Sequence, residues 1–196
     1  MFKLIKRDYQ KARLEIQDGD LAFYRANWKL TNKWIAWAGE SPYCHVGMVA
    51  WWHGHLILLD TIQGKGGQCT RMSKQVEQYS GEWDIYRIVD PKYRPEDAIR
   101  KMIEVLDVPY GVQALVKAMI MATLRKIPYI KNHYQKVMPD FITMGFPYCS
   151  MSTSFAVREG GGVDLYPEKA DQFTEPGDLI KDKDKIEGFC TLILEE

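Results

Sequence analysis

The sequence has no excess of charge of either sign. Its 196 residues include 26 lysines and arginines and 26 aspartates and glutamates, so the formal net charge is zero. Proteins that bind nucleic acid without sequence preference neutralise phosphates with a surplus of basic side chains. We therefore expect no nucleic-acid partner. The proportions of 46% hydrophobic and 27% charged residues are those of a globular protein, which excludes a disordered or fibrous chain.

Long apolar runs are also absent. No stretch approaches the ~18 uninterrupted apolar residues of a membrane span, and the first eight residues lack the apolar core of a signal peptide. We expect no transmembrane segment and a protein that is cytoplasmic as synthesised, with export by another route or association with a virion left open. Peripheral contact with a membrane also stays open, because the segment 112–126 is apolar around much of its helical circumference, although a core helix is the simplest interpretation.

Cysteine and histidine are scarce. The four cysteines form no Cys-x-x-Cys pair, and no Gly-x-Ser-x-Gly motif marks a serine nucleophile. Cys44 and His45 lie near His53 and His55 in the sequence, but a hairpin places His45 about 26 Å from its turn, too far to share a zinc ion with the other histidines. We expect reduced thiols, no metal site and no cofactor. The oligomeric state is left open.

The turn signals indicate a single domain, 1–196, with its strands first and most of its helices later. Apolar runs predict strands at 21–25, 68–72, 83–89 and 189–194, and a hairpin of 45–52 with 55–61 around the turn His53-Gly54. Helical patterns lie at 33–38, capped by Thr31 or Asn32, at 73–79, from Pro95, at 112–126 and at 148–158. Because the strands are joined by hairpins rather than βαβ crossovers, we expect an α+β fold with an antiparallel sheet.

Cys149 is the first candidate for chemistry. Pro147 stops any preceding helix, and a helical pattern begins at Tyr148 or Cys149. The partial positive charge of a helix N-terminus stabilises a thiolate and lowers the pKa of the thiol. Small residues at 152, 153 and 156 would let another segment pack closely on this helix. The alternative is a buried structural cysteine, a common environment for this residue.

His45 is the candidate base, because of the register that the hairpin imposes. If His53-Gly54 is the turn, paired residue numbers sum to 107, so Gly47 faces Asp60 and His45 is a diagonal neighbour of Asp60 on the same face. A carboxylate beside an imidazole fixes its tautomer and favours its protonated form. Asp60 also lies in an apolar run, where a buried carboxylate needs a partner. The alternative for His45 is a histidine bonded to a backbone carbonyl, and a one-residue slip in register would reverse the argument.

In this order, these segments resemble the permuted papain-fold hydrolases typified by YiiX, relatives of the NlpC-type cell-wall peptidases and of the lecithin:retinol acyltransferase group. The histidine precedes the cysteine, as circular permutation of a papain-like enzyme implies. The matching stretches are Gly19–Phe23, Gly39–Tyr43, His45–Val49, Val108–Gly111, Tyr148–Ser150 and Pro176–Leu179.

The resemblance implies a permuted papain-like (NlpC-like) fold, with an antiparallel sheet or partial barrel packed against helices. It makes Cys149 the nucleophile and His45 the base, and gives Asp60 the orienting role that is usually filled by glutamate. Tyr43, Tyr110 and Tyr148 are candidates for substrate binding and a second oxyanion donor, with aromatic packing as the alternative.

The function expected from these residues is that of a cysteine hydrolase acting on an amide or ester bond through an acyl-enzyme. Two substrates remain open: a cell-wall-type peptide or isopeptide, and a lipid acyl bond. The alternative from another class is a non-catalytic structural or binding protein, such as an assembly or virion component, that keeps the scaffold.

Overall fold

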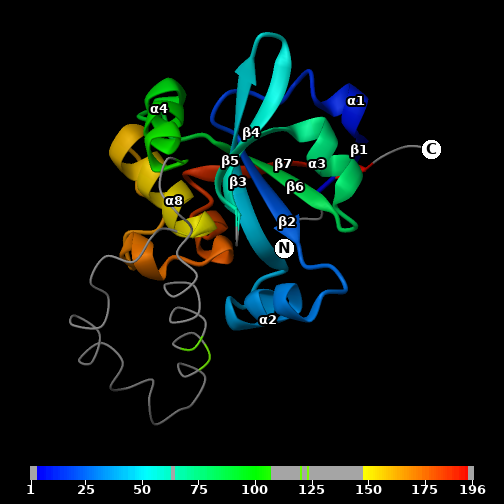
Figure 1. Ribbon diagram of the computed structural model, residues 1–196. Helices are drawn as coiled ribbons and strands as arrows, with labels where there is room; N and C mark the ends of the chain where they lie inside the picture. The colour runs from blue at the N-terminus through cyan, green and yellow to red at the C-terminus, as the bar shows by residue number, and fades with distance from the viewer. Residues whose placement is uncertain (1–3, 63–64, 107–119, 121–122, 124–147, 194–196) are drawn as a thin grey trace.

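The computed structural model describes residues 4–62, 65–106, 120, 123 and 148–193. Within these ranges strands come first and most helices follow (Figure 1). The elements are β1 (Lys6–Asp8), α1 (Tyr9–Ala12), β2 (Leu21–Arg25), α2 (Leu30–Ala38), β3 (Tyr43–Trp52), β4 (His55–Ile62), β5 (Gly66–Arg71), α3 (Met72–Gln78), β6 (Trp83–Ile88), α4 (Pro95–Leu106), α8 (Cys149–Phe155), the π-helical turn η1 (Ala156–Gly160), the short helices η2 (Asp171–Phe173) and η3 (Pro176–Ile180), and β7 (Ile186–Ile193).

The described strands form one seven-stranded sheet in the order β1-β7-β6-β2-β3-β4-β5. All neighbouring pairs are antiparallel except β1 with β7, which are parallel. The predicted α+β class with an antiparallel sheet is therefore confirmed. The one parallel pair lies at the edge, where β1, from the start of the chain, runs beside the last strand in the same direction.

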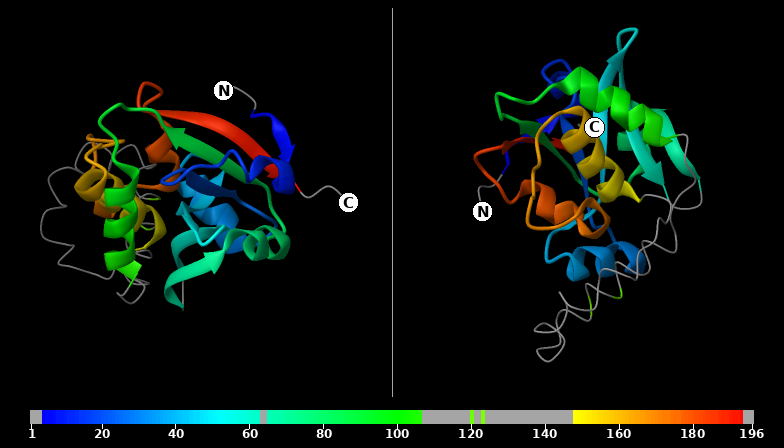
Figure 2. Two further views of the ribbon diagram at one scale, coloured as in Figure 1. Left: turned by 90° about the horizontal axis from the view of Figure 1, so that it is seen from above. Right: turned by 90° about the vertical axis from the view of Figure 1, so that its left-hand side faces the viewer.

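Helices cover both faces of the sheet. Helices α4 and α8 lie side by side on one face, and α1 and α3 lie on the other (Figure 2). Two apolar cores follow, one on each face. The first core joins side chains of α4 and η1 to alternate residues of β2 and β3, and includes Leu21, Phe23, Met48, Ala98, Met102 and Val157. The second core joins side chains of α1 and α3 to the residues in between, and includes Ala22, Tyr24, Val49, Tyr9, Met72 and Val76.

The central hairpin has the predicted register. Met48 pairs with Leu59 and Trp52 with His55, so paired numbers sum to 107. His53 and Gly54 both have positive φ, 47° and 77°, as a two-residue turn with the twist of a hairpin requires. A local turn thus fixes which residues of β3 and β4 share a face.

Two predictions near the N-terminus were wrong. Residues 6–12, for which the sequence predicted neither strand nor helix, contain β1 and α1, and α1 begins after Asp8, whose side chain accepts the Lys11 N–H at 3.3 Å. Helix α2 starts at Leu30 rather than at residue 33, and neither Thr31 nor Asn32 caps it. Instead, the Asn27 side-chain oxygen accepts from the Lys29 N–H and the Asn32 amide, so the chain turns into the helix earlier.

The predicted helix at 112–126 and Tyr110 lie outside the described residues, apart from positions 120 and 123. In the part of the chain that the structure describes, no helix has the length and hydropathy needed to cross a bilayer.

Candidate active site

His45 lies near the start of β3, where the strand pairs with β2, before its pairing with β4 begins at Met48. It pairs with Tyr24 of β2, and the register between these two strands shifts at the next residue, Arg25. This bulge turns Cys44 and His45 to the same side of the sheet, since Cys44 contacts the Tyr24 carbonyl and the His45 ring packs on the Tyr24 ring. The His45 side chain is 18% exposed.

Asp60 faces His45 from β4. The carboxylate is fully buried, and its Oδ2 lies 2.9 Å from Nε2 of His45. Because a carboxylate only accepts hydrogen bonds, Nε2 carries the proton of this contact. Gly47 provides the space, as a Cβ built there would lie 2.8 Å from the Asp60 Cβ. The diagonal contact expected from the hairpin is therefore present.

Tyr24 is a third member of the cluster, which sequence reasoning missed. Its hydroxyl donates to the same Oδ2 of Asp60 at 3.1 Å, and its ring meets the His45 ring edge to face at 4.6 Å. Burial and the nearby Asp60 charge raise the pKa of Tyr24 well above its ordinary value, so the hydroxyl remains a donor. The strand 21–25 was predicted, but its register against β3 was not, and the tyrosine could be placed only by that register.

Cys149 is the first residue of α8, as predicted. Tyr148 precedes it in an extended conformation, and the Tyr148 carbonyl accepts the first helical bond, from the Ser152 N–H at 2.9 Å. Small side chains let the helix approach the sheet, where the Ser152 Oγ lies 3.4 Å from the Thr61 Oγ1 of β4. On another side, Ser150 donates to the carbonyl of Thr174, between η2 and η3, at 2.7 Å. The helix is thereby held with its N-terminus, and the thiol, against β3.

The Cys149 thiol and the His45 side chain lie close enough to change each other's acidity. Burial alone would raise the pKa of Cys149, but the His45 charge, its hydrogen bond and the backbone N–H groups of Val46 and Ser150 lower it. Burial alone would lower the pKa of His45, but Cys149 and Asp60 raise it well above its usual value. Both directions favour a thiolate beside an imidazolium.

The other three cysteines have the opposite environment. Burial raises the pKa of Cys44 and of Cys69, and it raises the pKa of Cys190 to about 12. None is in a disulfide. Cys149 is the one thiol of the four that its surroundings make more acidic.

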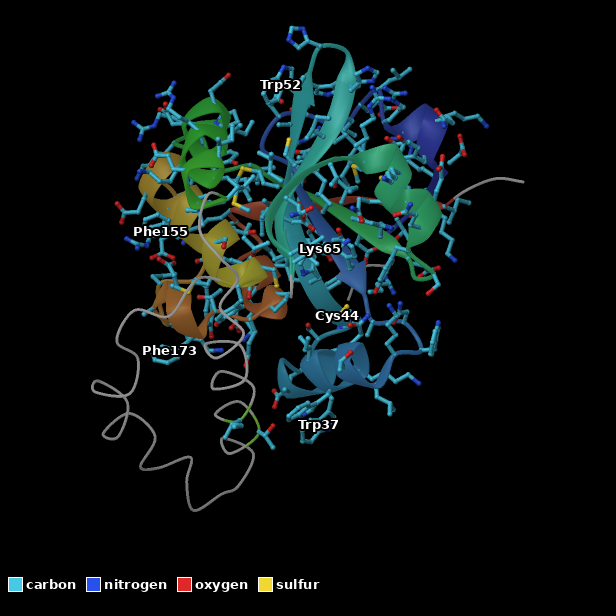
Figure 3. The ribbon with its side chains drawn as sticks, viewed as in Figure 1. Trp37, Cys44, Trp52, Lys65, Phe155 and Phe173 are labelled. Atoms are coloured by element: carbon cyan, nitrogen blue, oxygen red, sulfur yellow. The ribbon has the colours of Figure 1, made fainter. Side chains whose placement is uncertain are left out.

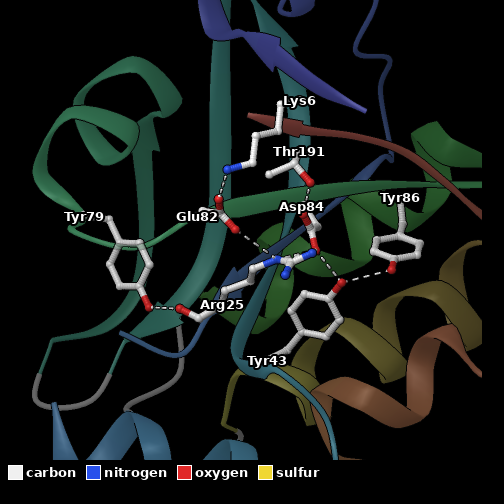
Figure 4. Close-up of polar contacts among 8 residues, drawn as sticks. All are labelled: Lys6, Arg25, Tyr43, Tyr79, Glu82, Asp84, Tyr86 and Thr191. Atoms are coloured by element: carbon white, nitrogen blue, oxygen red, sulfur yellow. Dashed lines mark hydrogen bonds and ion pairs between the residues drawn. The ribbon is translucent and has the colours of Figure 1, made fainter. Parts of the chain in front are cut away.

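The candidate tyrosines have different locations. Tyr43 is fully buried, and its hydroxyl is bonded to Asp84 at 2.5 Å and to Tyr86 at 2.9 Å, within the polar network of Figure 4. Tyr43 therefore has the alternative role, aromatic packing in the core, and it offers no surface to a substrate. Tyr148 is also buried, directly before the nucleophile candidate. Tyr110 lies outside the described residues.

The same geometry does not suit a metal ion. Nε2 of His45, one of the two ring atoms that could bind a metal, is already bonded to Asp60. Across the described ranges, no three His, Cys, Asp or Glu side chains are grouped as metal ligands.

No protein-family model and no curated protein matches this sequence. A solved structure does match its fold: "Crystal structure of metalloprotein yiiX from Escherichia coli O157:H7", with 11% identity and a TM-score of 0.59. The match covers 92% of this chain and 97% of that one. The expected YiiX-like, papain-type fold is therefore confirmed, in an α+β chain that is 11% identical in sequence to that protein.

Proposed function

We propose that this protein is a cysteine hydrolase that cleaves an amide or ester bond through an acyl-enzyme on Cys149. The observation that carries the proposal is the position of His45, whose Nε2 lies 2.9 Å from Asp60 and whose charge is close enough to Cys149 to lower the pKa of its thiol. A nucleophile, a base and a group that orients the base are the parts such chemistry needs.

In the first half of the reaction, the Cys149 sulfur attacks the substrate carbonyl carbon. The carbonyl oxygen becomes an oxyanion, and we assign the Cys149 N–H, at the start of α8, as its backbone donor. Imidazolium His45 gives its proton to the leaving amine or alcohol as the bond to carbon breaks. The products are a thioester on Cys149 and a neutral imidazole.

In the second half, neutral His45 takes a proton from water, and the resulting hydroxide attacks the thioester. The acid leaves and the thiolate–imidazolium pair is restored. Another hydroxyl or amine in place of water gives acyl transfer instead. Asp60 keeps the ring oriented and stabilises its charge throughout.

Reactivity of the thiol tests the proposal. At mildly acidic pH, iodoacetamide should alkylate Cys149 before Cys69, although Cys69 is exposed and Cys149 is buried. The variant His45→Ala should abolish this preference, because it removes the positive charge that lowers the pKa of Cys149. Mass spectrometry of the alkylated peptides measures both rates within one molecule.

The outcomes also separate the enzyme from its alternative, a non-catalytic protein that keeps the scaffold. Equal alkylation of all four cysteines, or faster alkylation of Cys69, would contradict catalysis. A fluorogenic acyl ester and a short cell-wall peptide then distinguish the two substrate classes, with Cys149→Ala as the inactive control.

A further inference from the structure

Helix α2 presents an apolar stripe to solvent. Leu30, Trp34 and Trp37 recur at the spacing of one helix face, and they are 83%, 44% and 53% exposed. Trp28, two residues before the helix, is 71% exposed. An apolar helix face normally packs on a core, but the buried residues of α2 are the small Ala36 and Ala38, and Ile35 is partly buried against the second core.

Basic side chains flank the stripe. Lys29 precedes the helix and Lys33 lies within it, and both are exposed. Neither lysine forms an ion pair with the described residues. Glu40, just beyond the helix, is the acidic residue nearest in sequence, and α2 itself contains no acidic residue.

The stripe lies at the end of the molecule that carries the candidate active site. Figure 3 shows Trp37 pointing away from the sheet on α2, beyond the end of β3 where Cys44 precedes His45. A hollow of about 450 Å³, lined by Ala36, Trp37, Glu40, Ser41 and Pro42, continues this surface to the start of β3. Trp52 lies at the opposite end of the same strand.

We propose that Trp28, Leu30 and Trp34, with Lys29 and Lys33, form a docking surface for an anionic phospholipid bilayer. Tryptophan suits the boundary between headgroups and acyl chains, because its ring is apolar and its N–H is polar. Exposed lysines beside an apolar stripe complement acidic headgroups, as in helices that lie in the plane of a membrane.

The docking surface has a consequence for the site that rests on the proposed function. A protein held on a bilayer by α2 has the β3 end with His45 near the lipid. Of the two substrates left open, the lipid acyl bond is then the one available to Cys149.

Sedimentation with vesicles tests the docking surface without any reaction. The full chain should bind vesicles of phosphatidylcholine with phosphatidylserine, and bind phosphatidylcholine alone more weakly. The combined variant Trp28→Ser, Leu30→Ser and Trp34→Ser should reduce the partition coefficient by about tenfold or more. Trp52→Ser is the matched control, because Trp52 is 55% exposed but distant, and it should bind as the unmodified chain does.

A second set of variants tests the contribution of the two lysines to vesicle binding. Lys29→Glu with Lys33→Glu should remove the preference for phosphatidylserine, whereas Lys74→Glu, at an exposed position of α3, should leave it unchanged. Cys149→Ala should bind vesicles normally. If it does, while the unmodified protein shows no preferential alkylation of Cys149, the docking surface stands and the proposed hydrolase fails.

Four results would overturn the docking surface. The first is no vesicle binding by the unmodified chain, and the second is equal loss in Trp52→Ser. The third is a dimer, seen by sedimentation without lipid, that the triple variant abolishes, since a second copy would then cover the stripe. The fourth is a lower urea midpoint in the triple variant, which would mean that another segment of this chain covers it.

Discussion

Tyr24 and His45 donate hydrogen bonds to the same oxygen of Asp60, at 3.1 and 2.9 Å. Their rings also meet nearly at right angles, at 88°, so rotation of either ring disturbs the other. The second oxygen of Asp60, Oδ1, is buried with no side-chain or backbone partner among the described residues. The orientation of the carboxylate thus depends on these two donors, and Tyr24 is a positioning residue for the base.

The substitution Tyr24→Phe keeps the ring contact and removes only the hydroxyl. We expect the free energy of unfolding to fall by about 1 kcal/mol, the usual value of a buried hydrogen bond. Alkylation of Cys149 should slow about three- to tenfold, because the less constrained Asp60 orients His45 less well. Urea unfolding and alkylation rates measure the two effects.

Tyr86→Phe is the control for this change. Its hydroxyl also has a buried partner, the hydroxyl of Tyr43, but it lies in the Asp84 network rather than beside His45. A similar loss of stability with an unchanged alkylation rate should result. If both variants slow alkylation equally, Tyr24 acts only through general stability.

The substitution Asp60→Asn tests the charge on the base. Without the carboxylate, the pKa of His45 falls, and a less positive His45 lets the pKa of Cys149 rise. The thiolate–imidazolium pair then persists over a narrower pH range. In a plot of alkylation rate against pH, the acid limb moves to higher pH and the alkaline limb moves to lower pH. Each shift should be on the order of one pH unit. Alkylation rates across the pH range measure both limbs.

Asp84→Asn is matched to this variant because Asp84 is equally buried. Its carboxylate accepts from Arg25, Tyr43 and Thr191, so its loss should reduce the free energy of unfolding. The limbs of its pH profile should stay in place. Movement of the limbs in Asp84→Asn would show that they report fold stability.

The sequence allowed the His45–Asp60 contact to be predicted because one local turn determines it. Two residues, His53 and Gly54, set the whole register between β3 and β4. No such turn joins β2 to β3, since α2 intervenes and the register shifts after Tyr24. The Tyr24 contact is therefore a tertiary result that local signals do not encode.

The N-terminal strand shows the same limit. Residues 6–8 form a strand only because Lys6 pairs with Thr191 at the other end of the chain. Three polar residues have no strand pattern of their own. Cys149, by contrast, was placed correctly at the start of a helix, because proline and the helical pattern after it are local signals.

Gly47→Ala tests the space above Asp60. The new Cβ would lie 2.8 Å from the Asp60 Cβ and 2.9 Å from the Leu59 carbonyl oxygen, so the hairpin must shift. We expect a loss of about 1–3 kcal/mol in the free energy of unfolding, together with slower alkylation of Cys149. Urea unfolding and peptide mass spectrometry check both.

Gly54→Ala provides the comparison for that variant. Gly54 has a positive φ of 77° but no atom within 4 Å of an added Cβ. The free energy of unfolding of Gly54→Ala should fall by about 1 kcal/mol from backbone strain alone, and the alkylation rate of Cys149 should stay normal. If Gly47→Ala also leaves alkylation unchanged, the close fit between Gly47 and Asp60 does not position the base.

The buried carboxylate of Asp178 predicts how stability depends on pH. Burial alone would raise the pKa of Asp178, but Lys169 at 2.6 Å and Lys181 at 2.5 Å lower it below its ordinary value. A carboxylate whose folded pKa lies below its unfolded pKa stabilises the fold above about pH 4, and this contribution is lost as the pH falls through the folded pKa. The free energy of unfolding should therefore decline with acidity over this range.

Two variants assign that acid dependence to its source. Asp178→Asn cannot ionise, so it should be less stable than the unmodified chain at neutral pH and approach it below about pH 4. Asp182→Asn also loses a lysine contact, with Lys185, but Asp182 is more exposed, and water screens the pair. Because Lys185 also lowers the pKa of Asp182, the slope of the Asp182→Asn stability curve should change in the same direction as in Asp178→Asn, but by less. Parallel curves for Asp178→Asn and the unmodified chain would instead show that other carboxylates cause the acid dependence, because removal of a titrating group with a shifted pKa must change the slope.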